Sequence, residues 1–253
     1  FRVFPISNWT ELDVWQYIER EQIALPSLYY THQREIVGRK GLLVPVTPLT
    51  PLRSGEQRVV LQEKRWLGHP IYRPLDDSTI AFCHEGPRDA IDARMWLINA
   101  DGSNMRKVRQ HQPGESFTHE FWVPDGSALY YVAHQENDPH RYLYRADPAT
   151  LENRQLMAIP PCSHLMSNHD GSLVVGDGAP HSTGDIQLND PFIWVFDIAA
   201  DKQTAVCRHD STWKVIEGER QATHPHPSFS PDNRWVLFTS DKEGMPALYL
   251  AEV

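Results

Sequence analysis

The stretch His119–Tyr131 (HEFWVPDGSALYY) contains the pattern that decides the fold. A histidine precedes the aspartate of a Pro-Asp-Gly-Ser turn by six residues, and an apolar segment follows that turn. Apolar segments rich in aromatic residues and bounded by Pro, Asp, Gly and Ser are typical of short β-strands that leave tight turns. The stretch therefore predicts a histidine-bearing segment, a turn and then a strand.

The same order of histidine, turn and apolar strand occurs three more times, in His69–Phe82, His164–Val175 and His226–Phe238. A further strand is expected after each copy, in the order Met95–Ile98, Tyr142–Tyr144, Phe192–Phe196 and Leu248–Leu250. Repeats of about 45 to 60 residues with several short strands are typical of β-propeller blades. No helical periodicity competes in this region, so we predict an all-β, partial β-propeller.

The repeat places four histidines in related positions. The first strand of a propeller blade lines the central channel, and His119, His164 and His226 occupy equivalent positions at its start. His224 lies two residues before His226, and residues i and i+2 of an extended segment point to the same side. Neutral imidazole is the commonest transition-metal ligand. The pattern indicates a metal or catalytic centre; the alternative is that these histidines are structural and bond neighbouring blades.

Composition limits the possible partners and compartment. Residues 1–56 hold six Lys/Arg and six Asp/Glu, so the remaining chain carries the whole net charge of -9. An acidic surface without basic clusters argues against nucleic acid, and no apolar run approaches the roughly 20 residues of a membrane helix. We also find no leader-like start. Three cysteines without a Cys-x-x-Cys pair favour a reducing compartment, so a cytoplasmic location is expected.

Residues 1–56 read differently from the repeats. Thr10 is a suitable helix N-cap, and an apolar face continues from it to Glu21. Prolines interrupt the segment that follows, and the whole stretch is too short to build its own core. We therefore predict two regions, a short mixed helical and irregular segment over 1–56 and the propeller over 57–253.

The first region resembles a known enzyme subunit. Arg2–Ile18 (RVFPISNWTELDVWQYI), and the sequence onward to about Glu56, are similar to the part that follows the nucleotide-binding core in the small subunit of sulfate adenylyltransferase (ATP sulfurylase). That family holds ATP in a Ser-Gly-Gly-x-Asp-type loop, which has no counterpart here. The resemblance therefore implies a fragment that does not itself activate sulfate.

The propeller region carries a second resemblance, to the oligogalacturonate lyases of polysaccharide lyase family 22. It covers about residues 57–253 and implies a seven-bladed propeller of which about four blades are present. Six ordered motifs carry it: Trp66–Tyr72 (WLGHPIY), Phe82–Pro87 (FCHEGP), Asp92–Trp96 (DARMW), Thr118–Trp122 (THEFW), Cys162–Ser167 (CSHLMS) and Arg220–Pro227 (RQATHPHP).

The lyase resemblance implies a reaction and assigns roles to residues. The family cleaves short, often unsaturated, pectin fragments by β-elimination with a divalent ion, usually manganese. Arg94 and His119 would be the catalytic pair: His119 removes the proton alpha to the uronate carboxylate, and Arg94 binds a carboxylate and stabilises the developing charge. The implied metal ligands are His164, Gln221, His224 and His226. Gln221 reaches the side of His224 only if the chain turns between them.

Alternatives remain open at this stage. A salt bridge to Asp89 or Asp92 would explain Arg94 without catalysis. The whole chain could instead act as a sulfate adenylyltransferase subunit 2 fragment or as a non-catalytic propeller that only binds. A ring of about four blades leaves open sheet edges, which favour self-association. The join between the two resemblances indicates a fusion.

Overall fold

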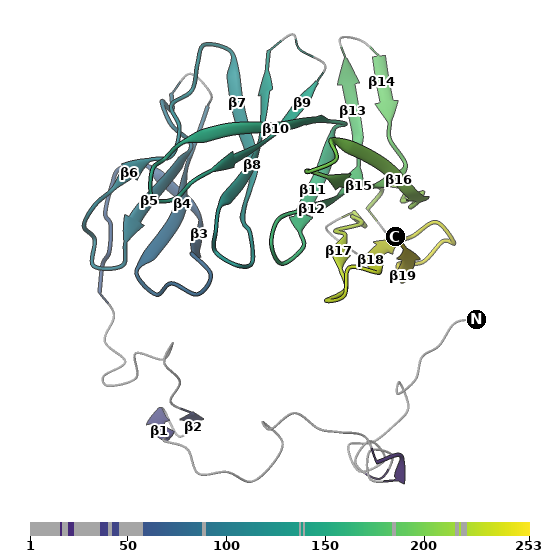
Figure 1. Ribbon diagram of the computed structural model, residues 1–253, viewed down its shortest axis with the longest axis horizontal. Coiled ribbons are helices and arrows are strands. Elements are labelled where there is room, and N and C mark those ends of the chain that lie inside the picture. Colours follow the sequence, from purple (N-terminus) through teal and green to yellow (C-terminus); the bar gives the residue numbers. More distant parts are fainter. Residues whose placement is uncertain are drawn as a thin grey trace. The chain divides into compact units, whose positions relative to one another are not determined.

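The computed structural model describes residues 16, 20–22, 36–39, 42–45, 58–87, 90–136, 138, 140–183, 186–215, 218 and 222–253. By its internal contacts the chain divides into two units, Phe1–Gln57 and Arg58–Val253 (Figure 1). In the first unit, β1 (Ile36–Arg39) and β2 (Leu42–Pro45) pair as an antiparallel hairpin. The helix predicted from Thr10 to Glu21 lies largely outside the described residues.

The second unit consists of β-sheets in which consecutive strands are mostly neighbours. Three sheets have four strands and the last has three. The first blade contains β3 (Trp66–Tyr72), β4 (Thr79–Glu85), β5 (Met95–Asn99) and β6 (Arg106–Lys107). The second contains β7 (Glu115–Trp122), β8 (Leu129–Gln135), β9 (Arg141–Ala146) and β10 (Asn153–Ile159).

The third blade is interrupted by a two-stranded extension. It contains β11 (Cys162–Ser167), β12 (Leu173–Gly178), β15 (Phe192–Asp197) and β16 (Lys202–Arg208). The hairpin of β13 (Pro180–Thr183) and β14 (Ile186–Asn189) is inserted between β12 and β15. The last blade contains β17 (Ser228–Phe229), β18 (Trp235–Ser240) and β19 (Ala247–Glu252).

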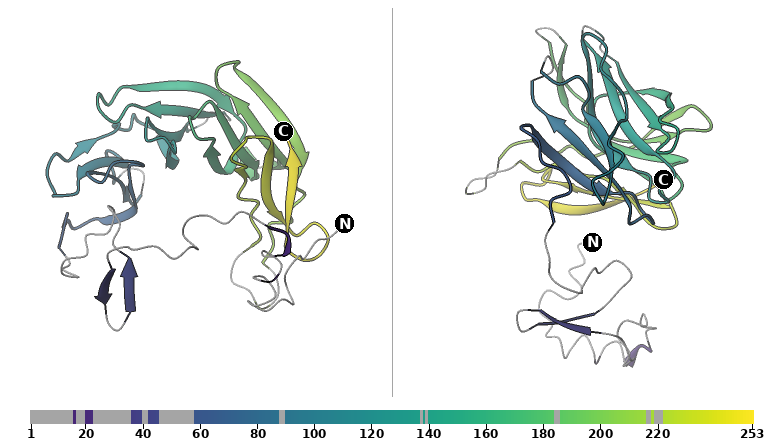
Figure 2. Two further views of the ribbon diagram at one scale, coloured as in Figure 1. Left: turned by 60° about the horizontal axis from the view of Figure 1, so that its bottom comes forward. Right: turned by 90° about the vertical axis from the view of Figure 1, so that its left-hand side faces the viewer.

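The arrangement of these sheets confirms the partial propeller. Figure 2 shows the four sheets following one another along an open arc, and β11 contacts β7 on one side and β17 on the other. The first strands of successive blades are thus neighbours along the inside of the arc. All eight apolar segments predicted as strands lie in strands of the structure. The β13–β14 hairpin was not predicted.

Apolar side chains fill the spaces between neighbouring blades. One core cluster joins Leu97 of the first blade to Tyr131 of the second, and another joins Val132 to Phe196 of the third. A third cluster joins the third blade to Phe238 of the last. Burial of one large apolar side chain stabilises the folded state by about 1.5–3 kcal/mol. Because these clusters span neighbouring blades, each blade is stabilised by packing against the next.

The turn aspartates of the repeat all act in the same way. Their carboxylates accept a hydrogen bond from the backbone N–H two residues later, as at Asp125 with Ser127 (2.8 Å) and Asp170 with Ser172 (3.0 Å). Such Asx-turns fix the tight reversal between the first two strands of a blade. The hydrogen bonds also lower the pKa of Asp125. Asp76 and Asp232 repeat the contact in the first and last blades.

A β-bulge occurs at the same place in the first strand of three blades. The strand register shifts between Gly68 and Ile71, between Thr118 and Phe121, and between Cys162 and Leu165. His69 and His119 lie within the first two of these irregularities and have positive φ values of 49° and 54°, and His226, just before β17, has a φ of 45°. A bulge leaves its extra residue outside the ladder and re-aims the side chain. The repeat histidines are therefore released from strand pairing.

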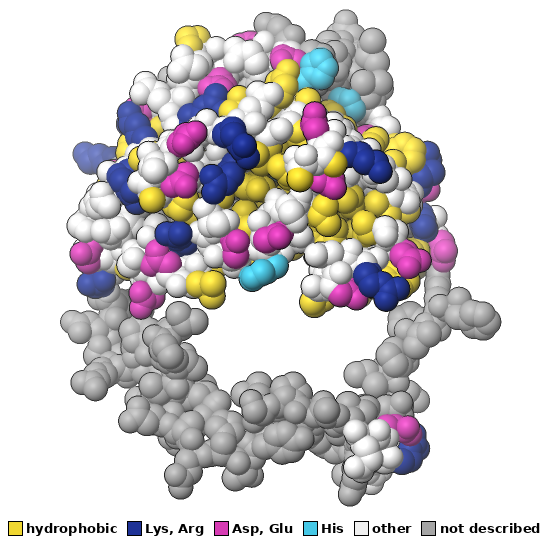
Figure 3. Space-filling view, in the orientation of Figure 1, with side chains coloured by type: hydrophobic (Ala, Val, Ile, Leu, Met, Phe, Trp, Pro, Cys, Tyr) yellow, Lys and Arg dark blue, Asp and Glu magenta, His cyan; other side chains and the backbone are white. Residues whose placement is uncertain are grey.

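Both terminal blades expose large apolar side chains, which on β3 of the first blade are Trp66, Ile71 and Tyr72. On the first blade, Arg58 donates to the Ala100 carbonyl (2.6 Å) and Glu63 lies 3.0 Å from His84. On the last blade, alternate apolar side chains of β18 and β19 are exposed, namely Trp235, Leu237, Leu248 and Leu250. In Figure 3, hydrophobic side chains gather toward the lower right, near β17 and β18 of Figure 1.

Candidate metal centre and catalytic cluster

Three histidines from two blades converge at the inner side of the arc. Ligand nitrogens of His164, His224 and His226 all lie within 4.8 Å of one another. The ring centroids of His164 and His226 are 3.4 Å apart, and those of His164 and His224 are 5.2 Å apart. The two-residue spacing thus places His224 and His226 on one side, with nearly parallel rings. Gln221 lies outside the described residues.

Asp177 on β12 holds two of these histidines. Its side chain is fully buried and accepts hydrogen bonds from the His164 backbone N–H (2.6 Å) and from the His226 backbone N–H (3.3 Å). His164 Nδ1 also lies 2.9 Å from an Asp177 oxygen. A carboxylate that accepts the Nδ1 proton fixes the imidazole tautomer. His164 therefore presents Nε2 as its free lone pair.

His224 is held by contacts on the opposite side. Its ring lies 4.9 Å from the Trp213 ring, and the Ser211 hydroxyl donates to the carbonyl of the preceding Thr223 (2.8 Å). Ser211 is in turn hydrogen-bonded to Asp241. His224 Nδ1 is buried without a hydrogen-bond partner among the described residues. An orphaned ring nitrogen is costly unless something else binds it.

The donor set fits a transition-metal ion. Three imidazoles offer nitrogen lone pairs within reach of one point, one tautomer is fixed by a carboxylate, and one nitrogen lacks a partner. Burial and the neighbouring His164 lower the pKa of His226, which keeps it in the neutral, ligating form. Imidazole ligands of this kind suit zinc, iron, copper and nickel ions.

His119 lies between this cluster and a charged cluster on the first blade. Its side chain is exposed, but surrounding protein atoms reduce its hydration and, with His164, lower its pKa below the ordinary value of 6.5. Asp177 and Arg94 also act on it electrostatically, so both clusters are close by. A neutral, accessible imidazole at such a position is suited to accept a proton.

Arg94 is held by two carboxylates. Glu85 binds it in bidentate fashion (2.9 and 3.1 Å), and Glu120 accepts from Nε and Nη2 (both 3.1 Å). These bonds outweigh the effect of burial and raise the pKa of Arg94. The alternative partner Asp92 instead contacts Lys107 (2.6 Å), and Asp89 lies outside the described residues. The guanidinium is thus fixed in place next to the His119 bulge.

A second group of metal-type ligands, His69, Cys83 and Glu120, surrounds this guanidinium. This second group is less suited to bind a metal ion than the histidine cluster, because the Arg94 guanidinium already neutralises the Glu120 carboxylate. Burial and the Glu120 carboxylate also raise the pKa of the Cys83 thiol, so the thiolate that a metal requires is not formed. The Cys83 thiol instead donates to Glu120 (3.0 Å).

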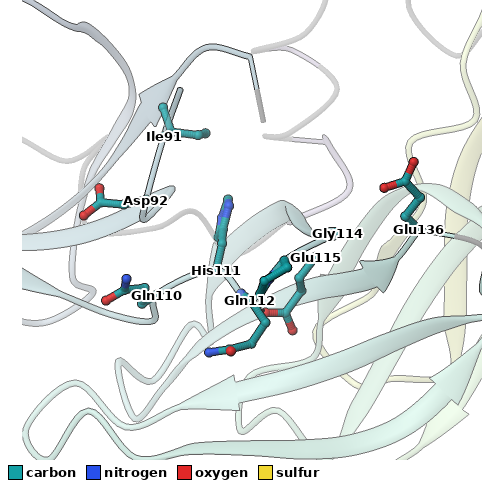
Figure 4. Close-up of a pocket in the computed structure, with 9 residues that line it drawn as sticks. Ile91, Asp92, Gln110, His111, Gln112, Gly114, Glu115 and Glu136 are labelled. Atoms are coloured by element: carbon teal, nitrogen blue, oxygen red, sulfur yellow. Dashed lines mark hydrogen bonds between the residues drawn. The ribbon is translucent and has the colours of Figure 1, made fainter. Parts of the chain in front are cut away.

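An open hollow elsewhere contains none of the six predicted site residues. It is lined by residues around the start of β7, with Asp92 and Gln110 on one side and Glu136 on the other (Figure 4). Burial lowers the pKa of His111 in this hollow, and Glu115 is bonded to Arg109. These groups show no convergence on a common point.

The structure brings five of the six predicted residues into one region and adds three that the sequence reasoning missed. Asp177, Glu120 and His69 were not assigned a role. Glu120 follows His119 directly, and His69 begins the first repeat, so position alone could have drawn attention to both. Asp177 has no such signal, because only the pairing of β11 with β12 brings it to His164.

The blades and the histidine cluster at their inner side define the class of protein, a β-propeller with a candidate metal centre. Comparison with known proteins defines the family. A family model described as oligogalacturonate lyase matches residues 46–253. An oligogalacturonide lyase of Pectobacterium atrosepticum is 60% identical over 208 residues, which are 80% of this chain and 54% of that protein. The solved structure of an oligogalacturonate lyase in complex with manganese shares 64% identity and a TM-score of 0.73, over 80% of this chain and 52% of that one.

The chain belongs to the oligogalacturonate lyase family, and it spans about half the length of the curated lyases that it matches. Its beginning is similar to different proteins. A phosphoadenosine phosphosulfate reductase domain model matches residues 1–42. Sulfate adenylyltransferase subunit 2 of Streptomyces lavendulae is 66% identical over 55 residues, which are 22% of this chain and 17% of that protein. Both predicted resemblances are confirmed.

Within the described residues, no helix has the length and apolar character needed to cross a membrane.

Proposed function

We propose that the chain is an oligogalacturonate lyase that cleaves short, pectin-derived galacturonate oligomers by β-elimination and leaves a 4,5-unsaturated uronate. The observation that carries the proposal is the convergence of His164, His224 and His226 next to a neutral, exposed His119. Metal ligands and a base side by side are what proton removal alpha to a carboxylate requires. Membership of the lyase family supports the same reaction.

The metal ligands would be the three clustered histidines and Gln221. We propose manganese or another divalent transition ion, since a related lyase was solved in complex with manganese. When bound, such an ion supplies Lewis-acid stabilisation of the negative charge that develops on the uronate carboxylate. Asp177 keeps His164 and His226 oriented for it.

The chain's own residues then perform the proton transfer. His119 accepts the C5 proton because it is neutral and accessible. Arg94 places a permanent positive charge near the reacting centre, and its bonds to Glu85 and Glu120 hold it there. Those carboxylates occupy its donors and offset its charge, so Arg94 binds a substrate carboxylate by exchanging one of them for it.

We further propose that the two regions join near residues 56 and 57 as a fusion, that the protein acts in the cytoplasm, and that it contacts neither nucleic acid nor a membrane. The three cysteines are free thiols, which suits a reducing compartment. The exposed apolar face and open edge of the last blade favour self-association through the ends of the propeller.

The test is to incubate the purified full chain with digalacturonate and manganese and to follow the ultraviolet absorbance of the new C4=C5 bond. We expect the signal to rise for the wild type and to be abolished for His119→Ala. Manganese that binds stoichiometrically without any rise in absorbance would instead support a non-catalytic propeller that only binds.

A further inference from the structure

One member of the histidine repeat has no part in the reaction described so far. His69 begins the first repeat, lies in the bulge of β3, and has a positive φ of 49° beside the 54° of His119. Non-glycine residues are held in this region at an energetic cost, and such outliers gather at functional sites. His69 therefore shares its register and backbone conformation with the proposed base.

The contacts of His69 place it next to the His119 bulge. Its Nδ1 lies 2.5 Å from Glu120, which directly follows His119, and Glu120 is almost fully buried between His69, Cys83 and Arg94. The imidazole itself remains 56% exposed. An accessible imidazole oriented by a buried carboxylate is the arrangement found in acid–base catalysis.

The two ring nitrogens have different surroundings. Nδ1 is engaged by Glu120, whereas Nε2 lies 3.5 Å from Glu85, beyond an ordinary hydrogen bond. No hydrogen bond to Nε2 occurs within the described part of the chain. When the ring is doubly protonated, Nδ1–H is donated to Glu120, and Nε2–H is the ring proton that can be offered to a bound molecule.

The chemistry of galacturonate calls for a second proton-transfer group. In this sugar the C5 hydrogen and the C4 oxygen are both axial and point to opposite faces of the ring. A base that removes the C5 proton from one face cannot also protonate the departing oxygen on the other. His119 and His69 come from neighbouring blades, so they can approach a sugar from different sides.

We propose that His69 is the general acid that protonates the oxygen leaving C4. The inference rests on the proposed lyase function. His119 takes the C5 proton, and the C5–H electron pair forms the C4=C5 bond. The C4–O bond breaks with its electron pair on oxygen, and that oxygen takes the proton from His69 Nε2. Water then returns a proton to His69 and removes one from His119, so protons and electrons balance.

The variant for the test is His69→Asn, because asparagine accepts a positive φ and keeps a polar group beside Glu120 but cannot act as an acid. Two substrates are compared in manganese-loaded full chain. One is digalacturonate, whose sugar leaving group benefits from protonation. The other is a galacturonate that carries a 4-nitrophenyl ether at C4, whose leaving phenolate needs no proton.

We expect His69→Asn to lower kcat on digalacturonate about 10²-fold and to change kcat on the nitrophenyl ether less than about threefold. Manganese affinity, measured by calorimetry, should be unchanged. An equal loss on both substrates would overturn the proposal in favour of a role in holding Arg94 and Glu120, and full activity on both would overturn it outright. A wild type inactive on both substrates would contradict the lyase function, and the acid role with it.

His140→Asn is the matched control. His140 is also exposed and carboxylate-paired, with Nδ1 2.8 Å from Asp138, but it precedes β9 and lies in neither cluster. It should behave as wild type on both substrates. A comparable leaving-group effect in His140→Asn would show that the change reflects the loss of any surface imidazole and would overturn the specific role of His69.

Discussion

Two groups of ligand-type side chains line the inner strands, and they differ in the charge that surrounds them. His164, His224 and His226 form one group, and His69, Cys83 and Glu120 form the other. The first contains imidazole nitrogens, one of which, His224 Nδ1, has no hydrogen-bond partner among the described residues. The second already contains a cation, since Arg94 bonds Glu120.

The comparison of the two groups shows that residue type and proximity are not sufficient to identify a metal site. A carboxylate that is neutralised by a guanidinium has little to gain from a metal ion, and a buried thiol with a raised pKa does not supply a thiolate. We therefore assign the ion to the histidine group and proton chemistry to the group around Arg94. The following predictions test that division.

The largest effect is expected at His119, which lies between the two groups. His119→Ala removes the base, so kcat on digalacturonate should fall about 10²–10⁴-fold. Manganese affinity should stay close to the wild-type value in calorimetry, since this ring is not a proposed ligand. Loss of manganese binding in His119→Ala would show that His119 is itself a metal ligand and would contradict the separation of the two groups.

The second test compares one residue from each group. His226→Ala should weaken manganese binding roughly 10²-fold, because one ligand of a four-ligand site contributes about 3 kcal/mol. Glu120→Gln should leave manganese affinity within about threefold of wild type, because Arg94 and not a metal is its partner. Equal losses in the two variants would contradict the assignment.

Asp177 provides the third test, through its bonds to His164 and His226. Asp177→Asn should lower manganese affinity about 10–100-fold, as is usual when the carboxylate behind a ligating histidine is removed. The control is Asp190→Asn, just before β15, whose carboxylate accepts hydrogen bonds from the Phe192 N–H and the Trp194 indole. Wild-type affinity in Asp177→Asn would show that the ligands are held without it.

The pH profile offers a smaller and more gradual effect. His119 is a base only when neutral, and its pKa lies below the ordinary value of 6.5 because of reduced hydration and His164. The acid limb of the kcat/KM profile should therefore lie below pH 6.5, where kcat/KM falls about tenfold per pH unit. An acid limb centred above pH 7 would indicate that a different group is the base.

The smallest effect is expected at Cys83. Cys83→Ser keeps a donor for Glu120, so manganese affinity should not change and the free energy of unfolding should fall by about 1 kcal/mol. Manganese titration and urea unfolding measure the two quantities. A drop in manganese affinity would show that the thiol binds the ion after all.

The sequence was sufficient to predict the blades, because turns and apolar strands are local signals. Asp125, Asp170 and their counterparts make the predicted turns, and the apolar segments after them are strands. The i, i+2 spacing likewise predicted that His224 and His226 share a side. The role of each site residue was available only through the resemblance to a family.

The missed features depend on pairing between distant parts of the chain. Asp177 meets His164 because β12 pairs with β11, and Glu120 meets Arg94 because neighbouring blades pack together. No local pattern marks Asp177 as a site residue, and the place of Glu120 directly after His119 does not reveal its partner. The salt bridge expected at Asp89 or Asp92 is not tested at Asp89, and the partners that the structure gives Arg94 are Glu85 and, 26 residues away, Glu120.

The bulge in the first strands of three blades affects how the sequence of such a protein can evolve. Residues outside the ladder carry no strand hydrogen bond, so exchanging the exposed His119 alters chemistry without breaking a strand pair. Three blades thus carry one such position each on a scaffold that is stabilised elsewhere. New specificities can arise one blade at a time, by single substitutions at the same register.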